Sequence, residues 1–233
     1  MSAVVTRPAA PRPVARSRIQ RFLTSTIGLK ILMALTGVIL SGFVLGHMAG
    51  NLQAFQGQKA LDHYGELLHM EPALLWLVRL VLLSAVGVHI WAYIVLMRKN
   101  ASARSSAYRE TSHKESTYAS RSMRVTGPLL LLFIIYHILH LTTGTVHPSF
   151  EEGKVYHNLT SGLSVGWVAA IYLLAMGMLG LHLWHGVWSL FQTLGANQPR
   201  YNSLGRRFAT VFTVVVVLGF AAIPLAAMAG YFK

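Results

Sequence analysis

Four long apolar stretches of this 233-residue chain contain histidine, whose imidazole can bind a metal ion or carry a proton. Ionisable side chains are rare inside apolar stretches of this length, and they usually face the interior of a helix bundle or a cofactor. One such histidine could serve only as a hydrogen-bonding group between helices, but four stretches that share the feature indicate a common chemical role. The residues are His47, His89, His137, His140, His182 and His185.

Paired histidines on facing helices suit bis-imidazole ligation of a haem iron. Depth along the helices tests this interpretation, because an α-helix rises about 1.5 Å per residue and the flanking basic residues mark one membrane boundary. The count predicts two layers of histidines, which could hold two stacked haems and form an electron path across the membrane. The outer layer contains His47, His137 and His140, and the inner layer contains His89, His182 and His185.

Each of the two histidine doublets leaves a choice of ligand. His140 follows His137 by three residues, and His185 follows His182 by three, which is a difference in depth of only about 4.5 Å. Depth alone slightly favours His140 and His185.

Small residues and one arginine accompany the histidines. Gly42, Gly46 and Gly50 recur at every fourth position, a spacing that suits either close helix packing or the edge of a flat macrocycle. Arg79 is the only arginine within the apolar stretches. It could neutralise a haem propionate, or it could extend its guanidinium to the outer membrane surface.

The stretches that position these residues are nearly free of charge. Hydrophobic residues make up 54% of the chain and charged residues 12%, about half the share that is usual in globular domains. About 20 apolar residues cross the hydrocarbon core as an α-helix, and lipid offers an open strand edge no hydrogen-bond partner. We therefore predict an all-α membrane protein with five transmembrane helices, of which the first four form a haem-binding bundle. The predicted spans are about 27–53, 73–97, 126–147, 164–193 and 208–230, within one cytochrome b domain over 22–233 that follows a basic tail over 1–21.

The net charge of +13 is unevenly distributed along the chain. Sixteen of the twenty basic residues lie before the first span, between the second and third, or between the fourth and fifth. The positive-inside rule therefore predicts a cytoplasmic N-terminus and an external C-terminus. Such a basic cytoplasmic face suits anionic lipid or a docked protein partner rather than nucleic acid. The chain has no cysteine, which excludes disulfides, iron–sulfur ligation and covalent haem attachment through its own residues.

Two connecting segments carry further predictions. Residues 54–72 place Leu61, Tyr64, Leu67 and Leu68 at helical spacing, which predicts an amphipathic helix on the outer membrane surface. Residues 98–125 are polar and rich in serine, and we expect a short cytoplasmic helix or an ordered turn there.

Five segments match the pattern of a known family. They are TSTIGLKILMALTG (24–37), GHMAGNLQ (46–53), HIWAYIVLMRK (89–99), GPLLLLFIIYHILHLTTG (127–144) and LHLWHGVWSLFQTLG (181–195). In these segments the chain resembles the di-haem cytochrome b membrane anchor of succinate:quinone oxidoreductases, the complex II group that includes quinol:fumarate reductases. In that family one histidine on each of the first four spans ligates haem. The resemblance implies that the ligands are His47 with His137 and His89 with His182, and that His140 and His185 are pocket residues.

The resemblance also implies partners and a place in electron transfer. A flavoprotein and an iron–sulfur protein would dock on the basic cytoplasmic face, in a bacterial cytoplasmic membrane. Electrons from succinate would pass through flavin, iron–sulfur clusters and two b haems to a membrane quinone, for which menaquinone is the expected type. This chain would be a subunit of that enzyme and would carry out no dicarboxylate chemistry itself.

A quinone site needs polar groups at a membrane edge, and two places supply them. The outer edge offers Asp62, His63, Glu66 and His69, and the inner edge offers Ser25 and Lys30.

Some members of that family also carry a glutamate two residues before the fourth ligand, where it serves proton transfer. Here that position is Gly180, so we do not expect such a proton path.

Two other classes of protein fit parts of this pattern. The first is a di-haem cytochrome b subunit of another quinone-linked oxidoreductase, such as a nitrate reductase, hydrogenase or formate dehydrogenase. The second is a haem-free membrane anchor or transporter, in which the histidines serve packing or proton relay. A b-type absorption band would distinguish the cytochromes from the haem-free second class. The identity of the soluble partner subunits would distinguish a complex II anchor from the first class.

Overall fold

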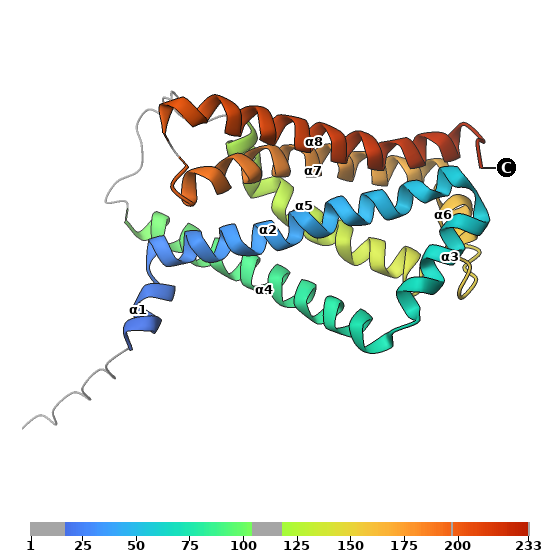
Figure 1. Cartoon of the computed structure of the whole chain (residues 1–233), viewed down its shortest axis with the longest axis horizontal. Helices are drawn as coiled ribbons and strands as arrows, with labels where there is room; N and C mark the ends of the chain where they lie inside the picture. The colour runs from blue at the N-terminus through green and yellow to red at the C-terminus, as the bar shows by residue number, and fades with distance from the viewer. Residues whose placement is uncertain (1–16, 104–117, 197, 233) are drawn as a thin grey trace, which may run out of the picture.

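Long helices make up most of the computed structural model, which describes residues 17–103, 118–196 and 198–232. Five of the helices are long and apolar enough to cross a membrane, and they lie side by side along the long axis of the molecule (Figure 1). Strands are absent from these described ranges, and the predicted class of an all-α membrane protein with five spans is confirmed. The spanning helices are α2 (Thr26–Asn51), α4 (Pro72–Ser102), α5 (Tyr118–Leu141), α7 (Gly166–Thr193) and α8 (Pro199–Met228).

Local sequence signals set several of the helix ends. The Ser25 side chain accepts a hydrogen bond of 3.0 Å from the Gly28 amide and so caps the start of α2. Proline occupies the first turn of both α4 and α8, where its missing amide proton costs nothing. The short helix α1 (Arg18–Leu23) begins with a capping box, so the predicted end of the basic tail at residue 21 falls inside a helix.

The third predicted span differs from the helix that forms. We predicted residues 126–147, but α5 ends at Leu141. Polar Thr142 and Thr143 follow, and Gly144 adopts a φ of +69°, a left-handed conformation that favours glycine. The Phe150 ring occupies the place where a side chain at 144 would lie. The segment predicted over 98–125 is helical at both of its ends, while its central residues 104–117 lie outside the described part of the chain.

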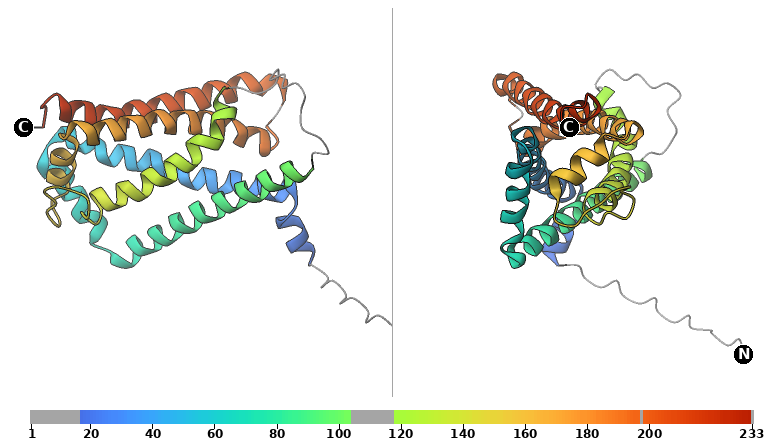
Figure 2. Two further views of the ribbon diagram at one scale, coloured as in Figure 1. Left: turned by 180° about the vertical axis from the view of Figure 1, so that it is seen from behind. Right: turned by 90° about the vertical axis from the view of Figure 1, so that its right-hand side faces the viewer.

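The spanning helices pack closely as α2 with α4, α5 with α7, and α7 with α8. Helix α2 also contacts α7 and α8, and it thereby joins the first of these pairs to the other helices. Within the described ranges, α4 packs closely on α2 and α3 but not on α5 or α7, and it diverges from α2 toward its own N-terminus (Figures 1 and 2). Among the described residues, the helix pairs α4–α7 and α2–α5 therefore do not pack closely through their backbones, and contacts between them are made by long side chains.

Three short elements cover one end of the bundle, which we call the capped end. They are the 3-10 helix η1 (Leu52–Gln56), α3 (Gln58–His69) and α6 (Val155–Leu163). The Asp62 carboxylate of α3 accepts a hydrogen bond of 2.8 Å from the Tyr156 amide of α6. Leu61 lies in the largest buried cluster together with residues of α6, α7 and α8. The prediction of a helix in this segment is confirmed.

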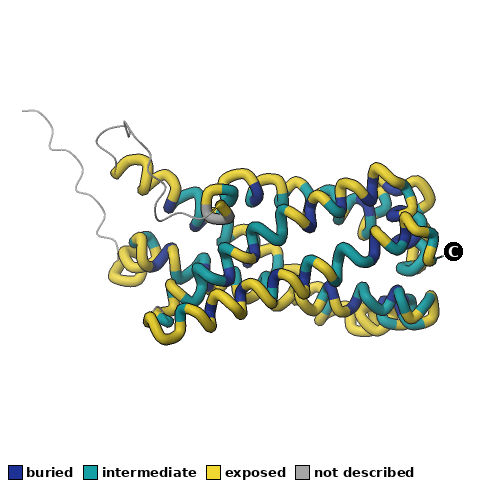
Figure 3. Tube along the Cα trace, turned by 90° about the horizontal axis from the view of Figure 1, so that it is seen from above, coloured by how far each residue is buried: buried dark blue, intermediate teal, exposed yellow. Residues whose placement is uncertain are grey.

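Exposed residues follow the outward faces of the long helices, as Figure 3 shows. Many of them are large and apolar, including Leu74, Leu83 and Trp167, each of which is at least 60% exposed. Apolar residues on the outside are expected where the surrounding solvent is lipid. We call the opposite end of the bundle, where α4 ends and α8 begins, the basic end, because Arg98, Lys99 and Arg206 lie there.

Replacing Gly50 by alanine is expected to destabilise the capped end. A Cβ atom at this position would lie 2.6 Å from ring atoms of Tyr64, which packs against the buried cluster and so has little freedom to move. Overpacking of this kind costs about 1–3 kcal/mol in free energy of unfolding. Thermal unfolding of the purified protein in detergent measures the effect. Gly87→Ala in α4 is the matched control, because no atom lies within 4 Å of its added Cβ, and equal stability of the two variants would contradict the prediction.

Candidate functional site

His47 of α2 faces His137 of α5. Their ring centroids are 5.7 Å apart, and the rings are nearly perpendicular, with an interplanar angle of 85°. Phe43 stacks on the His47 ring at 5.3 Å, one helical turn away. A small cavity of about 40 Å³ beside the pair is lined almost entirely by apolar side chains, with Asn51 and Tyr172 as the other polar groups.

His89 of α4 faces His182 of α7 in a second pair, with ring centroids 6.3 Å apart. The Thr36 hydroxyl lies 3.0 Å from His89 Nδ1 and also donates to the Leu32 carbonyl at 2.8 Å. Because a hydroxyl has a single proton, a Thr36 hydroxyl that donates to Leu32 can only accept from His89. That arrangement puts the imidazole proton on Nδ1 and leaves Nε2 as a bare acceptor. His182 Nδ1 is buried without a hydrogen-bond partner among the described residues.

The two pairs lie in separate layers, and two helices give the same spacing. On α2, Thr36 of one layer precedes His47 of the other by eleven residues, or about 16 Å of helix. On α5, Gly127 lies opposite His182 and precedes His137 by ten residues, or about 15 Å. The His89–His182 pair is the one nearer the basic end, and the His47–His137 pair is nearer the capped end.

His140 and His185, the second members of the two doublets, have different neighbours. His140 is fully buried, and its ring lies between Tyr136 at 5.5 Å and His147 at 4.8 Å. Its Nδ1 lies 3.0 Å from the Tyr172 hydroxyl. His185 is half-buried and lies one turn closer to the basic end than His182. The structure therefore places His137, rather than His140, against His47.

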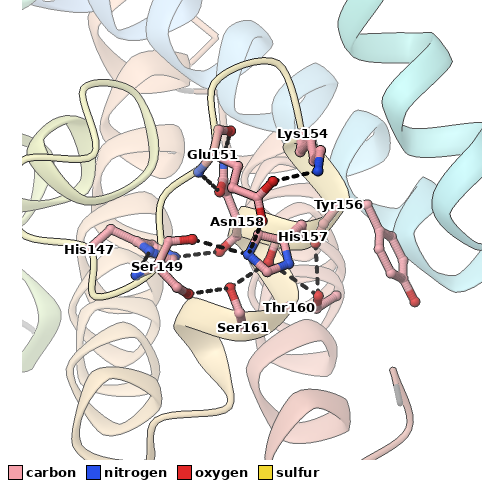
Figure 4. Close-up of polar contacts among 9 residues, drawn as sticks. All are labelled: His147, Ser149, Glu151, Lys154, Tyr156, His157, Asn158, Thr160 and Ser161. Carbon is pink, nitrogen blue, oxygen red and sulfur yellow. Dashed lines mark hydrogen bonds and ion pairs between the residues drawn. The ribbon is translucent and has the colours of Figure 1, made fainter.

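The loop between α5 and α6 holds a buried histidine that the sequence did not single out (Figure 4). The Ser149 amide donates to His147 Nδ1 at 3.0 Å, and His147 Nε2 donates to the Asn158 carbonyl at 2.9 Å. The Asn158 amide group in turn donates to the Glu151 carbonyl at 2.7 Å. At the surface, the hydrogen bond and charge of Lys154 hold the pKa of the Glu151 carboxyl below its usual value.

Several predicted site residues lie away from both histidine pairs. The Arg79 guanidinium lies 5.1 Å from the Trp76 ring centroid, on the exposed side of α4. Lys30 is exposed near the basic end of α2. Two other predicted residues are exposed on α3, where Glu66 lies 3.7 Å from His63 and His69 Nδ1 donates to the Gly65 carbonyl at 2.8 Å.

The predicted glycines divide into two groups. No atom lies within 4 Å of a Cβ built on Gly42 or Gly46, so these positions are not in close contact with a neighbouring helix. Gly50 instead packs on Tyr64. The glycines that adjoin the His89–His182 pair are Gly37 and Gly127, where an added Cβ would lie 3.8 and 4.0 Å from the respective imidazoles. Sequence reasoning missed these two because glycine is common in membrane helices.

The arrangement suits a cofactor that brings most of its own ligands. Within the described ranges, no group of three or more His, Cys, Asp or Glu side chains could hold a metal ion by itself. A haem needs only two axial protein ligands. Two imidazoles that bind opposite sides of one metal ion, each through a bond of about 2 Å, have ring centres roughly 6 Å apart. Both pairs have this separation, and Nδ1 of His182 adds a buried polar atom that lacks a partner within the described ranges.

Comparison with known proteins places this geometry in a family. The model of the succinate dehydrogenase/fumarate reductase transmembrane subunit family matches residues 96–222, from the end of α4 into α8. The match covers more than half of the chain and includes His137 and His182. Comparisons with curated proteins and with solved structures gave no significant match. The chain therefore belongs to the family of transmembrane subunits that anchor succinate dehydrogenase and fumarate reductase, the respiratory complex II, in the membrane.

Proposed function

We propose that this chain is the di-haem cytochrome b anchor of a succinate:quinone oxidoreductase and that it carries electrons between the iron–sulfur subunit and a membrane quinone. The observation that carries the proposal is the pair of facing histidines in each of two layers. Family membership supports the complex, and the histidine pairs support the cofactor. His47 and His137 would hold one haem, and His89 and His182 would hold the other.

The chain's own residues would prepare the ligands and exclude water. A Thr36 hydroxyl that donates to Leu32 would hold the proton of His89 on Nδ1 and leave Nε2 free to ligate. Apolar side chains such as Leu141 and Met176 line the cavity at the other pair and keep water out. When bound, a haem supplies the ability to accept and pass on single electrons.

The basic end would face the cytoplasm, with the N-terminus inside and the C-terminus outside a bacterial cytoplasmic membrane. The positive-inside rule and the position of Arg98, Lys99 and Arg206 support this orientation. The flavoprotein and iron–sulfur subunits would dock on that face. Electrons would then reach the His89–His182 haem first, because this pair is nearer the basic end.

A quinone, of which menaquinone is the expected type, would bind near the capped end. Of the predicted polar groups, Ser25 is used as the cap of α2, and Asp62 is used to hold α6. His63 and Glu66 instead lie close together on the exposed side of α3, with side chains at least two-thirds exposed. They are the described groups best placed to bind a quinone oxygen at this membrane edge.

A reduced-minus-oxidised spectrum of the purified complex tests the proposal. We expect a b-type α band and two haems per chain, together with co-purification of two soluble subunits that have succinate dehydrogenase activity. Absence of the α band from the intact complex would refute the cytochrome assignment. Co-purification with hydrogenase or nitrate reductase subunits instead would refute the assignment to complex II.

Replacing Thr36 by valine is expected to weaken haem binding by the His89–His182 pair about tenfold, since loss of a partner of a metal-bound histidine commonly costs this much. Competition with excess apomyoglobin, monitored by absorption, measures the haem that each layer retains. Thr213→Val is the matched control, because both threonines are 8% exposed and the Thr213 hydroxyl has no hydrogen-bond partner in the described part of the chain. Equal haem loss from the two variants would show that the Thr36 hydrogen bond has no specific role.

A further inference from the structure

We propose that Tyr172 of α7 is a positioning residue for His137, which fixes the imidazole tautomer and lowers the reduction potential of the haem bound there. The proposal rests on the function proposed above, since it assumes that His137 is a haem ligand. It adds a residue outside the histidine pattern to the site, and it gives a reason why His137 rather than its neighbour His140 faces His47.

Tyr172 lies where it can hold both histidines of the doublet. Its hydroxyl is 3.3 Å from His137 Nδ1 and 3.0 Å from His140 Nδ1. The side chain is 7% exposed and belongs to the largest buried cluster. Its ring meets Phe133 edge to face at 5.1 Å, which limits the movement of the ring.

The hydrogen-bonding capacity of the three groups restricts the tautomer of His137. A ligand that binds through Nε2 carries its proton on Nδ1, and within the described ranges the Tyr172 oxygen is the partner of that proton. The Tyr172 oxygen has two lone pairs, so it can accept from His137 whether it donates to His140 or accepts from it. In either arrangement Tyr172 is the acceptor that keeps Nε2 of His137 free for the metal.

His140 is held away from His47 by contacts on several sides. Its ring stacks between Tyr136 and His147, and Gly162 packs against it so closely that an added Cβ would lie 2.7 Å from its Cε1 atom. His147 is fixed in turn by its bonds to Ser149 and Asn158. A rigid set of contacts therefore runs from the loop between α5 and α6 through His140 to Tyr172, which gives the Tyr172 hydroxyl a fixed position.

An acceptor on Nδ1 makes a ligating imidazole more basic and favours the oxidised state of the metal. Tyr172→Phe removes the acceptor while it keeps the ring and its packing. We expect the midpoint potential of the His47–His137 haem to rise by about 59 mV, which corresponds to a tenfold change in the ratio of oxidised to reduced haem for one electron. The potential of the His89–His182 haem is expected to stay the same, and it reports within the same sample that the bundle is folded.

The experiment is a potentiometric titration of the complete complex, followed by absorption of the two haems. The His47→Ala complex identifies which component belongs to the His47–His137 pair. Tyr136→Phe is the matched control, because the Tyr136 hydroxyl is buried without a hydrogen-bond partner among the residues that the structure describes, and its ring also contacts His140. A change in that control equal to the change in Tyr172→Phe would overturn the proposal.

The remaining outcomes each decide the question. Selective loss of the His47–His137 haem from Tyr172→Phe would support the proposal, because phenylalanine keeps the packing and only the hydroxyl is removed. An unchanged potential and haem content, or an equal shift of both haems, would refute it. A wild-type complex without haem would instead refute the proposed function, so the two failures are distinguishable.

Discussion

Replacing His47 by alanine is expected to remove one haem of two and to leave the other in place. His47 and His137 face each other in one layer, while His89 and His182 lie about 15 Å away along the helices. A methyl group cannot ligate iron, so a haem at this site would keep only one axial protein ligand, His137. The pyridine haemochrome assay of the purified complex is expected to give half of the wild-type haem per chain.

His157→Ala is the control for this experiment. His157 lies on α6 at the same end of the bundle as the His47–His137 pair. Its Nε2 donates to the Ser149 carbonyl at 3.0 Å, so it is engaged in the loop and not in either histidine pair. We expect this variant to retain both haems. Loss of both haems from the His47 variant, with the chain still folded and inserted, would contradict the two-layer arrangement.

Replacing His182 by alanine is expected to remove the other haem and to interrupt electron flow. The remaining haem would still be reduced by dithionite, which reaches it chemically. Succinate would no longer reduce it at the rate of turnover, because the haem proposed to bind His89 and His182 would lie between it and the basic end, where the iron–sulfur subunit is proposed to dock. Rapid mixing with succinate, monitored at the α band, measures the difference between the two reductants.

The His185→Ala variant tests the assignment within the doublet. His185 lies one turn from His182 on α7, but the ring that faces His89 at 6.3 Å belongs to His182. We expect haem loss from the His182 variant and retention of both haems in the His185 variant. The reverse result would make His185 the ligand.

The five spans could be predicted from the sequence because the thickness of the hydrocarbon core sets the length of an apolar helix. The predicted windows begin and end within two residues of α2 and α7, whereas α8 begins nine residues before its window. The error at the end of α5 arose because residues 142–147 carry no Asp, Glu, Lys or Arg to mark the end of the span. Composition cannot show that the chain turns there. The turn depends on the φ of Gly144 and on Phe150, which packs against it from six residues away.

The sequence by itself determined the class of protein and the layers of histidine, because residue type and a rise of about 1.5 Å per residue are local properties of a helix. The family resemblance implied that His47 pairs with His137 and His89 with His182, but only the tertiary structure brings these side chains together. Depth slightly favoured His140, but the ring opposite His47 belongs to His137, while His140 lies against Tyr136 and His147. The difference arises from rotation about the helix axis: three residues change the depth little, but they turn a side chain toward a different neighbour.

Thr36 and Tyr172 were not predicted for the same physical reason. Threonine and tyrosine are ordinary residues of apolar helices, and nothing in their local sequence marks them. They become part of the candidate site because packing brings the Thr36 hydroxyl of α2 to His89 of α4, and the Tyr172 hydroxyl of α7 to His137 of α5. A hydrogen bond requires a separation of about 3 Å, and only the packing of helices far apart in the sequence creates it.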